Sequence, residues 1–178
     1  LNSTKYSIFS IVILCLAGLL IYSNTLSAPF HFDDYFSIVA NPKIKDLSNL
    51  KVIWGFWPTR FLTYYSLALN YHFGQLNVIG YHWFNITVHI ICGILVWWLI
   101  LTIFSTSESR SNSNKRIRTL AFFCALLFIA HPIQTQSVTY VIQRATSLAA
   151  LFYLASLAFY AKGRILQYDR DTSIWKIF

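Results

Sequence analysis

Two adjacent carboxylates, Asp33 and Asp34, follow His31 and Phe32 shortly after the first long apolar run of the chain. A carboxylate held at a surface can act as a general base that takes the proton from a hydroxyl placed against it. Two neighbouring acids can also offer oxygen ligands to a divalent cation, although nothing else in the sequence indicates one. The alternative is a solvated loop or a helix cap. Asp33 and Asp34 are therefore the candidate catalytic pair.

Two arginines have the chemistry to hold an anion, because a guanidinium offers a planar fork of donors that matches a phosphate or a carboxylate. Arg60 precedes an amphipathic pattern, where its alternative role is to anchor a helix at the membrane interface. Arg144 begins the last long apolar run. A charge at that position needs a local partner, either the acid pair or the phosphate of a lipid.

A histidine and a proline, His131 and Pro132, end another apolar run, and a polar stretch that includes Gln136 follows them. Proline frees a backbone carbonyl and turns the chain, which predicts a broken helix lining a cavity. His131 would then either donate to a ligand anion or cap its own turn.

Three polar side chains, His82, Asn85 and His89, recur at spacings of three and four and so share one helical face. Polar groups in a membrane helix face the bundle interior or a water-filled cavity, so these either line a cavity or join helices by hydrogen bonds. A metal site is disfavoured because no acid accompanies the histidines. A haem or quinone bundle using His89 and His131 would lack a second histidine pair.

The composition places these groups in a membrane protein. The 178 residues are 56% hydrophobic and 11% charged, with a mean hydropathy of +0.52. Soluble domains are about 25% charged and disordered chains are poorer still in apolar residues, so both classes are excluded. The net charge of +8 would favour nucleic acid in a soluble protein. Here the basic residues flank apolar runs, where membrane orientation explains them, and we expect no nucleic-acid partner.

The apolar runs predict an all-α polytopic membrane protein with a single membrane domain over 1–178. A membrane-spanning helix needs about 20 apolar residues, and four runs qualify once the turn after Pro132 is added to the third. The first run resembles a signal peptide, but it is longer than the roughly 7–15 residues of a signal core. The predicted transmembrane helices cover about 6–23, 81–104, 119–131 and 145–162.

The distribution of basic residues orients these spans. Lysines and arginines gather before the first span, in segment 105–118 and after the fourth span, which the positive-inside rule makes cytoplasmic. Both termini are then cytoplasmic, and segments 24–80 and 131–143 form outer loops. The membrane would be the inner or plasma membrane, or the endoplasmic reticulum in a eukaryote. The long outer loop should contain amphipathic juxtamembrane helices, because apolar residues recur there at helical spacing: Phe61, Tyr64, Leu67, Ala68 and Tyr71.

Taken in order, these motifs resemble a known family. The stretch from Phe30 to Asp34, followed by Asn41-Pro42, is similar to the first-loop motif of the transmembrane-and-tetratricopeptide-repeat O-mannosyltransferases and their bacterial relatives. These are multi-spanning glycosyltransferases of the GT-C type. The resemblance continues in three further places: Arg60 to Tyr71, the His-x-x-Asn-x-x-x-His pattern of His82 to His89, and the segment from His131 to Arg144.

This resemblance implies a glycosyltransferase that takes a sugar from a polyprenyl-phosphate carrier and transfers it to an acceptor hydroxyl on the outer face. An acid of the Asp33-Asp34 pair would be the base that activates the acceptor. Arg144, with Arg60 and His131, would bind the carrier phosphate and stabilise it as it leaves. The cavity would be lined by His82, Asn85, His89 and Gln136.

Several positions depart from the family pattern, and the chain is short for the family. Gln134, Gln136 and Thr146 stand where the family commonly has ionisable groups, while the acid pair and both arginines remain. The sequence contains no tetratricopeptide repeat, so we expect an N-terminal portion or a shortened relative. The alternative is a non-catalytic membrane subunit packed in a larger membrane complex. Expected partners are membrane lipid, the polyprenyl-phosphate sugar and that complex; the sequence identifies no cofactor.

Overall fold

A computed structural model describes residues 3–104 and 114–175, and within these ranges every regular element is helical. The predicted cytoplasmic loop 105–118 lies mostly outside the described residues, and its last residues form the start of a helix. The α-helices of the described residues are α1 (Ser3–Tyr22), α2 (Leu50–Phe56), α3 (Phe61–Gly74), α4 (Val78–Ile103), α5 (Asn114–Ala130), α6 (Thr135–Thr139) and α7 (Arg144–Trp175).

Three helices are long and apolar enough to cross a membrane: Thr4–Thr25, Val78–Ile103 and Val141–Tyr168. A fourth candidate is a bent pair, Lys115–Ala130 and Pro132–Thr139, whose axes meet at 47°. The bend falls at His131, directly before the proline that cannot continue the backbone ladder of α5. Over the part of the chain that the structure describes, the prediction of an all-helical membrane protein is confirmed, with three candidate spans, or four if the bent pair is one span.

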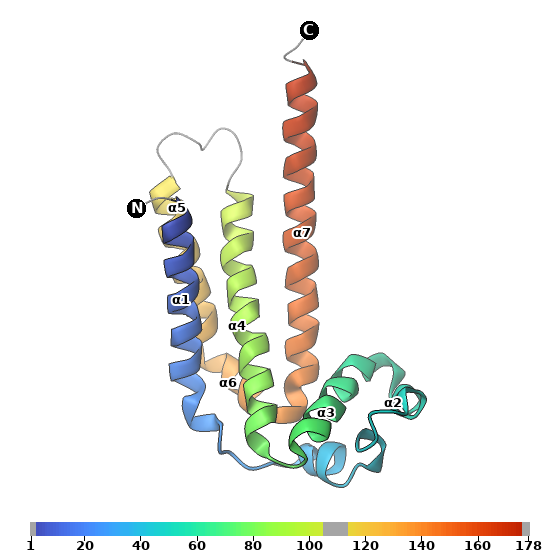
Figure 1. The fold of residues 1–178 in the computed structure, drawn as a ribbon. Coiled ribbons are helices and arrows are strands. Elements are labelled where there is room, and N and C mark those ends of the chain that lie inside the picture. The colour runs from blue at the N-terminus through green and yellow to red at the C-terminus, as the bar shows by residue number, and fades with distance from the viewer. Residues whose placement is uncertain (1–2, 105–113, 176–178) are drawn as a thin grey trace.

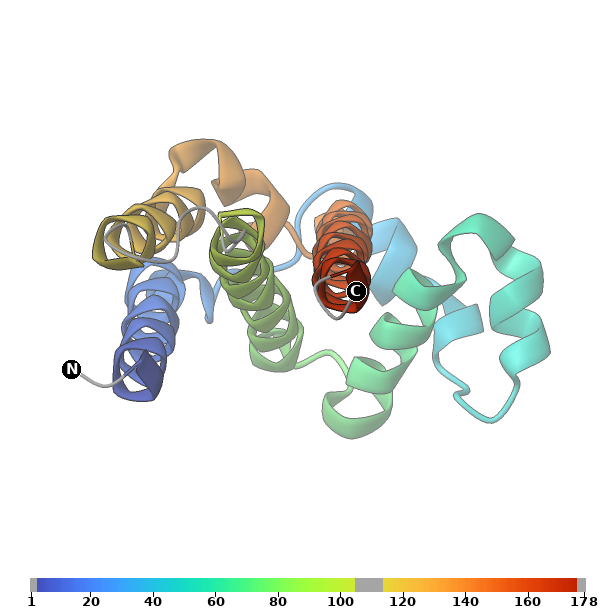
Figure 2. The same cartoon turned by 90° about the horizontal axis from the view of Figure 1, so that it is seen from above.

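Helix α4 is the centre of the bundle. Figures 1 and 2 show α1 and α5 along one side of it and α7 along the other, while α2 and α3 extend sideways at one end. The start of α1, the end of α4, the start of α5 and the end of α7 all lie at the opposite end (Figure 1). The long first loop and the bend before α6 are therefore gathered at one end of the bundle.

Two glycines let the central helices approach closely. A Cβ atom on Gly18 would lie 2.5 Å from Cγ1 of Ile90, and one on Gly93 would lie 2.5 Å from Cδ1 of Ile129. Small residues at helix crossings of this kind replace the hydrophobic driving force that lipid does not supply. The close α1–α4 and α4–α5 contacts are therefore possible only because Gly18 and Gly93 have no side chain.

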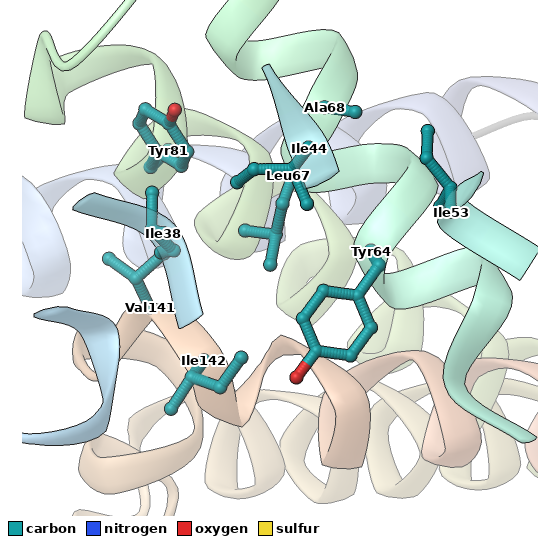
Figure 3. Close-up of a cluster of buried hydrophobic side chains, with 9 residues drawn as sticks. All are labelled: Ile38, Ile44, Ile53, Tyr64, Leu67, Ala68, Tyr81, Val141 and Ile142. Carbon is teal, nitrogen blue, oxygen red and sulfur yellow. The ribbon is translucent and has the colours of Figure 1, made fainter. Parts of the chain in front are cut away.

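The first loop has a hydrophobic core of its own (Figure 3). Residues from the loop, from α3 and from the segment before α7 are buried together, and Figure 3 shows Val141 and Ile142 beside Ile38. The predicted helical face of Tyr64, Leu67 and Ala68 is buried in this cluster, which confirms that the loop is structured. The cluster consists of Ile38, Ile44, Ile53, Tyr64, Leu67, Ala68, Tyr81, Val141 and Ile142.

We expect Gly93→Ala to lower the free energy of unfolding by about 1–3 kcal/mol, because the added methyl group overpacks the α4–α5 contact. Gly163→Ala is the matched control: a Cβ there meets nothing within 4 Å. The control should be neutral, or stabilising by up to about 1 kcal/mol through helix propensity. Thermal unfolding of both variants in detergent measures the difference, and equal melting temperatures would contradict the packing argument.

Candidate functional site

The two acids lie in one tight turn, residues 31–34, here called the acid turn, but their surroundings differ. Asp34 is 1% exposed. Its Oδ1 accepts a hydrogen bond from the amide of Ile142 at 2.8 Å, and its Oδ2 accepts one from the amide of His31 at 3.2 Å. Asp33 is exposed, and its amide donates to the Tyr140 hydroxyl at 2.9 Å. Asp34 therefore holds the turn, while Asp33 is exposed beside the Tyr140 hydroxyl.

Burial raises the pKa of the Asp34 carboxyl above its ordinary value, and hydrogen bonds from the backbone of His31, Ile142 and Val141 oppose that rise. Removing a carboxylate from water disfavours its charged form, whereas amide donors favour it. Burial is the larger effect at this site. Ionising Asp34 therefore costs more free energy in the folded protein than in water.

Arg144 is fully buried, with 0% of its surface exposed. Each of its three guanidinium nitrogens donates to a neutral acceptor: Nε to Asn85 Oδ1 at 2.8 Å, Nη1 to Ser66 Oγ at 3.1 Å, and Nη2 to the carbonyl of Tyr81 at 3.0 Å. The guanidinium carbon also lies 4.1 Å from the centre of the Phe84 ring. The sequence predicted the acid pair or a lipid phosphate as the partner of this arginine. Its hydrogen-bond partners are instead groups of α3 and α4, and the fork points into the protein.

The polar face of α4 is buried and joins other segments to the helix. His82 Nε2 is 3.0 Å from the carbonyl of Ala28, and His89 Nε2 is 3.1 Å from that of Ile129. Asn85 Nδ2 donates to the carbonyls of Val138 and Val141, both at 3.3 Å. These contacts match the alternative in which the polar face of α4 joins other segments by hydrogen bonds.

His131 and Gln136 lie at the bend between α5 and α6, and both are exposed. The Nδ1 atom of His131 accepts a hydrogen bond from the amide of Ile133 at 3.2 Å, so this histidine caps its own turn. The ring of His89, the other histidine of the disfavoured haem alternative, contacts the rings of Tyr22 and Phe128. Within residues 3–104 and 114–175, no three histidine, cysteine or acidic side chains are grouped so as to hold a metal.

A pocket of about 300 Å³ lies where the start of α3 meets α7. Arg60 lines its mouth, with its guanidinium carbon 4.8 Å from the centre of the Trp57 ring. The walls are apolar and aromatic, contributed on one side by Trp54 and Phe61 and on the other by Ala149 and Phe152 of α7. One exposed cation beside an apolar groove suits an amphiphile with an anionic head.

Sequence reasoning missed Tyr140. It is one of 11 tyrosines, and neither its neighbours nor its spacing distinguish it. Its contact with Asp33 joins residues 107 positions apart, so only the folded chain reveals it.

Comparison with known proteins identifies relatives over most of the chain. Protein O-mannosyl-transferase Tmtc3 of Drosophila melanogaster is 28% identical over 91% of this chain and 20% of its own length. Human protein O-mannosyl-transferase TMTC4 is 30% identical over 89% of this chain and 23% of its own length. For human TMTC2 the identity is 33%, over 82% of this chain and 18% of its own length.

The predicted family resemblance is therefore confirmed over this span. The chain spans about a fifth of the length of these relatives. No family model matches the sequence, and no solved structure matches it.

Replacing Arg144 should destabilise the bundle, because Arg144→Met removes three hydrogen bonds to buried acceptors. Each unsatisfied buried group costs about 1–3 kcal/mol, so we expect a loss of about 3 kcal/mol or more in the free energy of unfolding. Arg164→Met is the matched control, since Arg164 is exposed further along α7. Unfolding of both variants in the same detergent decides the point; equal stability would show that the buried donors are not needed.

The raised pKa of Asp34 predicts how stability depends on pH. A carboxyl whose pKa is higher in the folded than in the unfolded state contributes stability that is present below the unfolded pKa and lost as pH rises through the folded one. Wild-type protein should therefore gain stability relative to Asp34→Asn as the pH falls from 7 towards ~4. The measurement is the melting temperature of both proteins across this range.

Asp46 is the control of opposite sign. Hydrogen bonds from the side chain and amide of Ser48 lower the pKa of its carboxyl. Its contribution to stability is present above its unfolded pKa and lost as pH falls through the folded one. Wild type should accordingly lose stability relative to Asp46→Asn as the pH falls below ~4, through the lowered pKa of Asp46. The same sign for both substitutions would contradict the assignment.

Proposed function

We propose that this chain, a homologue of the protein O-mannosyl-transferases, forms the acceptor-activating part of a glycosyltransferase that uses a polyprenyl-phosphate-linked sugar. The observation that carries the proposal is the exposed carboxylate of Asp33, on a turn tied to the beginning of α7. By analogy with the names of the relatives, the sugar is mannose and the acceptor is a hydroxyl of a protein.

In the proposed reaction, the acceptor oxygen attacks the anomeric carbon of the sugar while Asp33 takes the hydroxyl proton. The bond between the anomeric carbon and the phosphate oxygen breaks, and the polyprenyl phosphate leaves with the electron pair. Asp33 suits the role of base better than Asp34, because the Asp34 oxygens accept hydrogen bonds from two backbone amides inside the protein.

The carrier would occupy the pocket between α3 and α7. Arg60 is exposed at its mouth and offers donors to the phosphate, whereas the donors of Arg144 already have protein partners. The aromatic and apolar walls would receive the first prenyl units. A positive charge placed at the departing phosphate stabilises the anion as it develops.

The proposed topology counts the bent pair of α5 and α6 as one span, giving four in all. The acid turn, α3 and the bend at His131 share one end of the bundle, which we assign to the outer or lumenal face (Figure 1). The start of α1 and the end of α7 share the other end, which we assign to the cytoplasm. Basic residues gather on that side, as the positive-inside rule requires.

Asp33→Asn should lower sugar transfer by a factor of about 10²–10⁴, because it removes the general base and leaves the fold intact. The assay follows radiolabelled mannose from polyprenyl-phosphate mannose to acceptor protein in membranes containing the protein. Asp46→Asn, at another acid of the same outer loop, is the matched control and should retain full activity. Persistent transfer by a folded Asp33→Asn variant would overturn the assignment of the base.

A further inference from the structure

The acid turn contains a strained residue. Phe32 has φ = 44°, in the left-handed backbone region that residues other than glycine and asparagine rarely adopt. Its ring is 87% exposed, so no packing of the side chain holds it there. Strain of this kind persists only where the surrounding structure over-determines the backbone, and it concentrates at functional sites.

Two long-range hydrogen bonds hold the turn in this conformation. The amide of Asp33 donates to the Tyr140 hydroxyl at 2.9 Å, and the carboxylate of Asp34 accepts from the amide of Ile142 at 2.8 Å. Both partners belong to one short stretch, residues 140–142, here called the anchor segment. The acid turn is thus held at two adjacent points by a segment more than 100 residues away.

The anchor segment is itself rigidly placed. Val141 is fully buried in the core beneath the first loop, and its carbonyl accepts from Asn85 Nδ2 at 3.3 Å. Asn85 in turn accepts from the buried Arg144. The Tyr140 hydroxyl therefore projects from a backbone that the central helix fixes, which makes it a reference point for the turn.

We infer that Tyr140 is a positioning residue for Asp33: its hydroxyl holds the strained backbone at Phe32 so that the Asp33 carboxylate meets the acceptor in a fixed orientation. This inference rests on the proposed function. The two hydrogen bonds have separate tasks. The buried Asp34–Ile142 bond attaches the turn to the protein, whereas the Tyr140 bond is made directly to the residue that presents the base.

The first test separates rate from binding. Tyr140→Phe removes only the hydroxyl, and we expect kcat for mannose transfer to fall about tenfold, because a slightly misplaced base loses its near-attack geometry. KM for the carrier should change by less than about twofold, because Tyr140→Phe does not remove a contact with the bound carrier. Tyr160→Phe, at an exposed tyrosine of α7, is the matched control and should match wild type. An unchanged kcat in Tyr140→Phe, or a loss confined to KM, would overturn the inference.

The second test uses the strain itself. Glycine adopts a positive φ without steric strain, so in Phe32→Gly the Tyr140 hydrogen bond no longer has to offset strain in the turn. Combining it with Tyr140→Phe should restore at least about a third of the lost rate, with Phe32→Gly alone as the reference for the double variant. A double variant no faster than Tyr140→Phe would show that the hydroxyl does not act through the strained backbone.

The third test does not depend on activity. Hydrogen exchange, read by mass spectrometry on the peptide covering 31–36 in lipid nanodiscs, should become about tenfold faster in Tyr140→Phe and stay unchanged in Tyr160→Phe. If wild-type protein transfers no sugar, the proposed function fails and exchange alone decides whether Tyr140 holds the turn. Unchanged exchange would overturn the positioning role whatever the activity.

Discussion

The structure depends on one buried cation. Arg144 is fully enclosed, and its three donating nitrogens join α3 through Ser66 and α4 through Asn85 and Tyr81 to the first turn of α7. Removing a guanidinium from water is costly, and the cost is offset only when its donors are satisfied and geometry is good. The first loop, the central helix and the last helix must therefore meet in one arrangement.

This constraint is passed on to the acid turn. Arg144 holds Asn85, Asn85 holds the carbonyls of Val138 and Val141, and the anchor segment that contains Val141 holds both acids. The two acids then divide the work by burial: Asp34 attaches the turn, and Asp33 presents a carboxylate. A pair of identical side chains acquires different properties because one is buried and the other is exposed.

Much of the architecture could be predicted from periodicity and hydropathy, which act locally. The apolar runs, the break at Pro132 and the buried face of α3 all follow from residues close together in sequence. The partners of Arg144 could not be predicted, since a buried guanidinium can donate to an anion or to neutral oxygens, and the sequence does not show which of these lies close. Tyr140 had no local signal at all, because its contact with Asp33 arises only when the first loop folds back on α7.

By itself, the sequence determined that this is a helical membrane protein, which motifs carry its polar groups, and which family those motifs resemble. Composition and spacing suffice for that, because membrane insertion and helix formation depend on stretches of contiguous residues. Only the tertiary structure shows which acid is exposed, that Arg144 points inward, and that Arg60 lies beside the pocket between α3 and α7. These outcomes depend on burial and on hydrogen bonds between distant segments, which only the packed chain brings together.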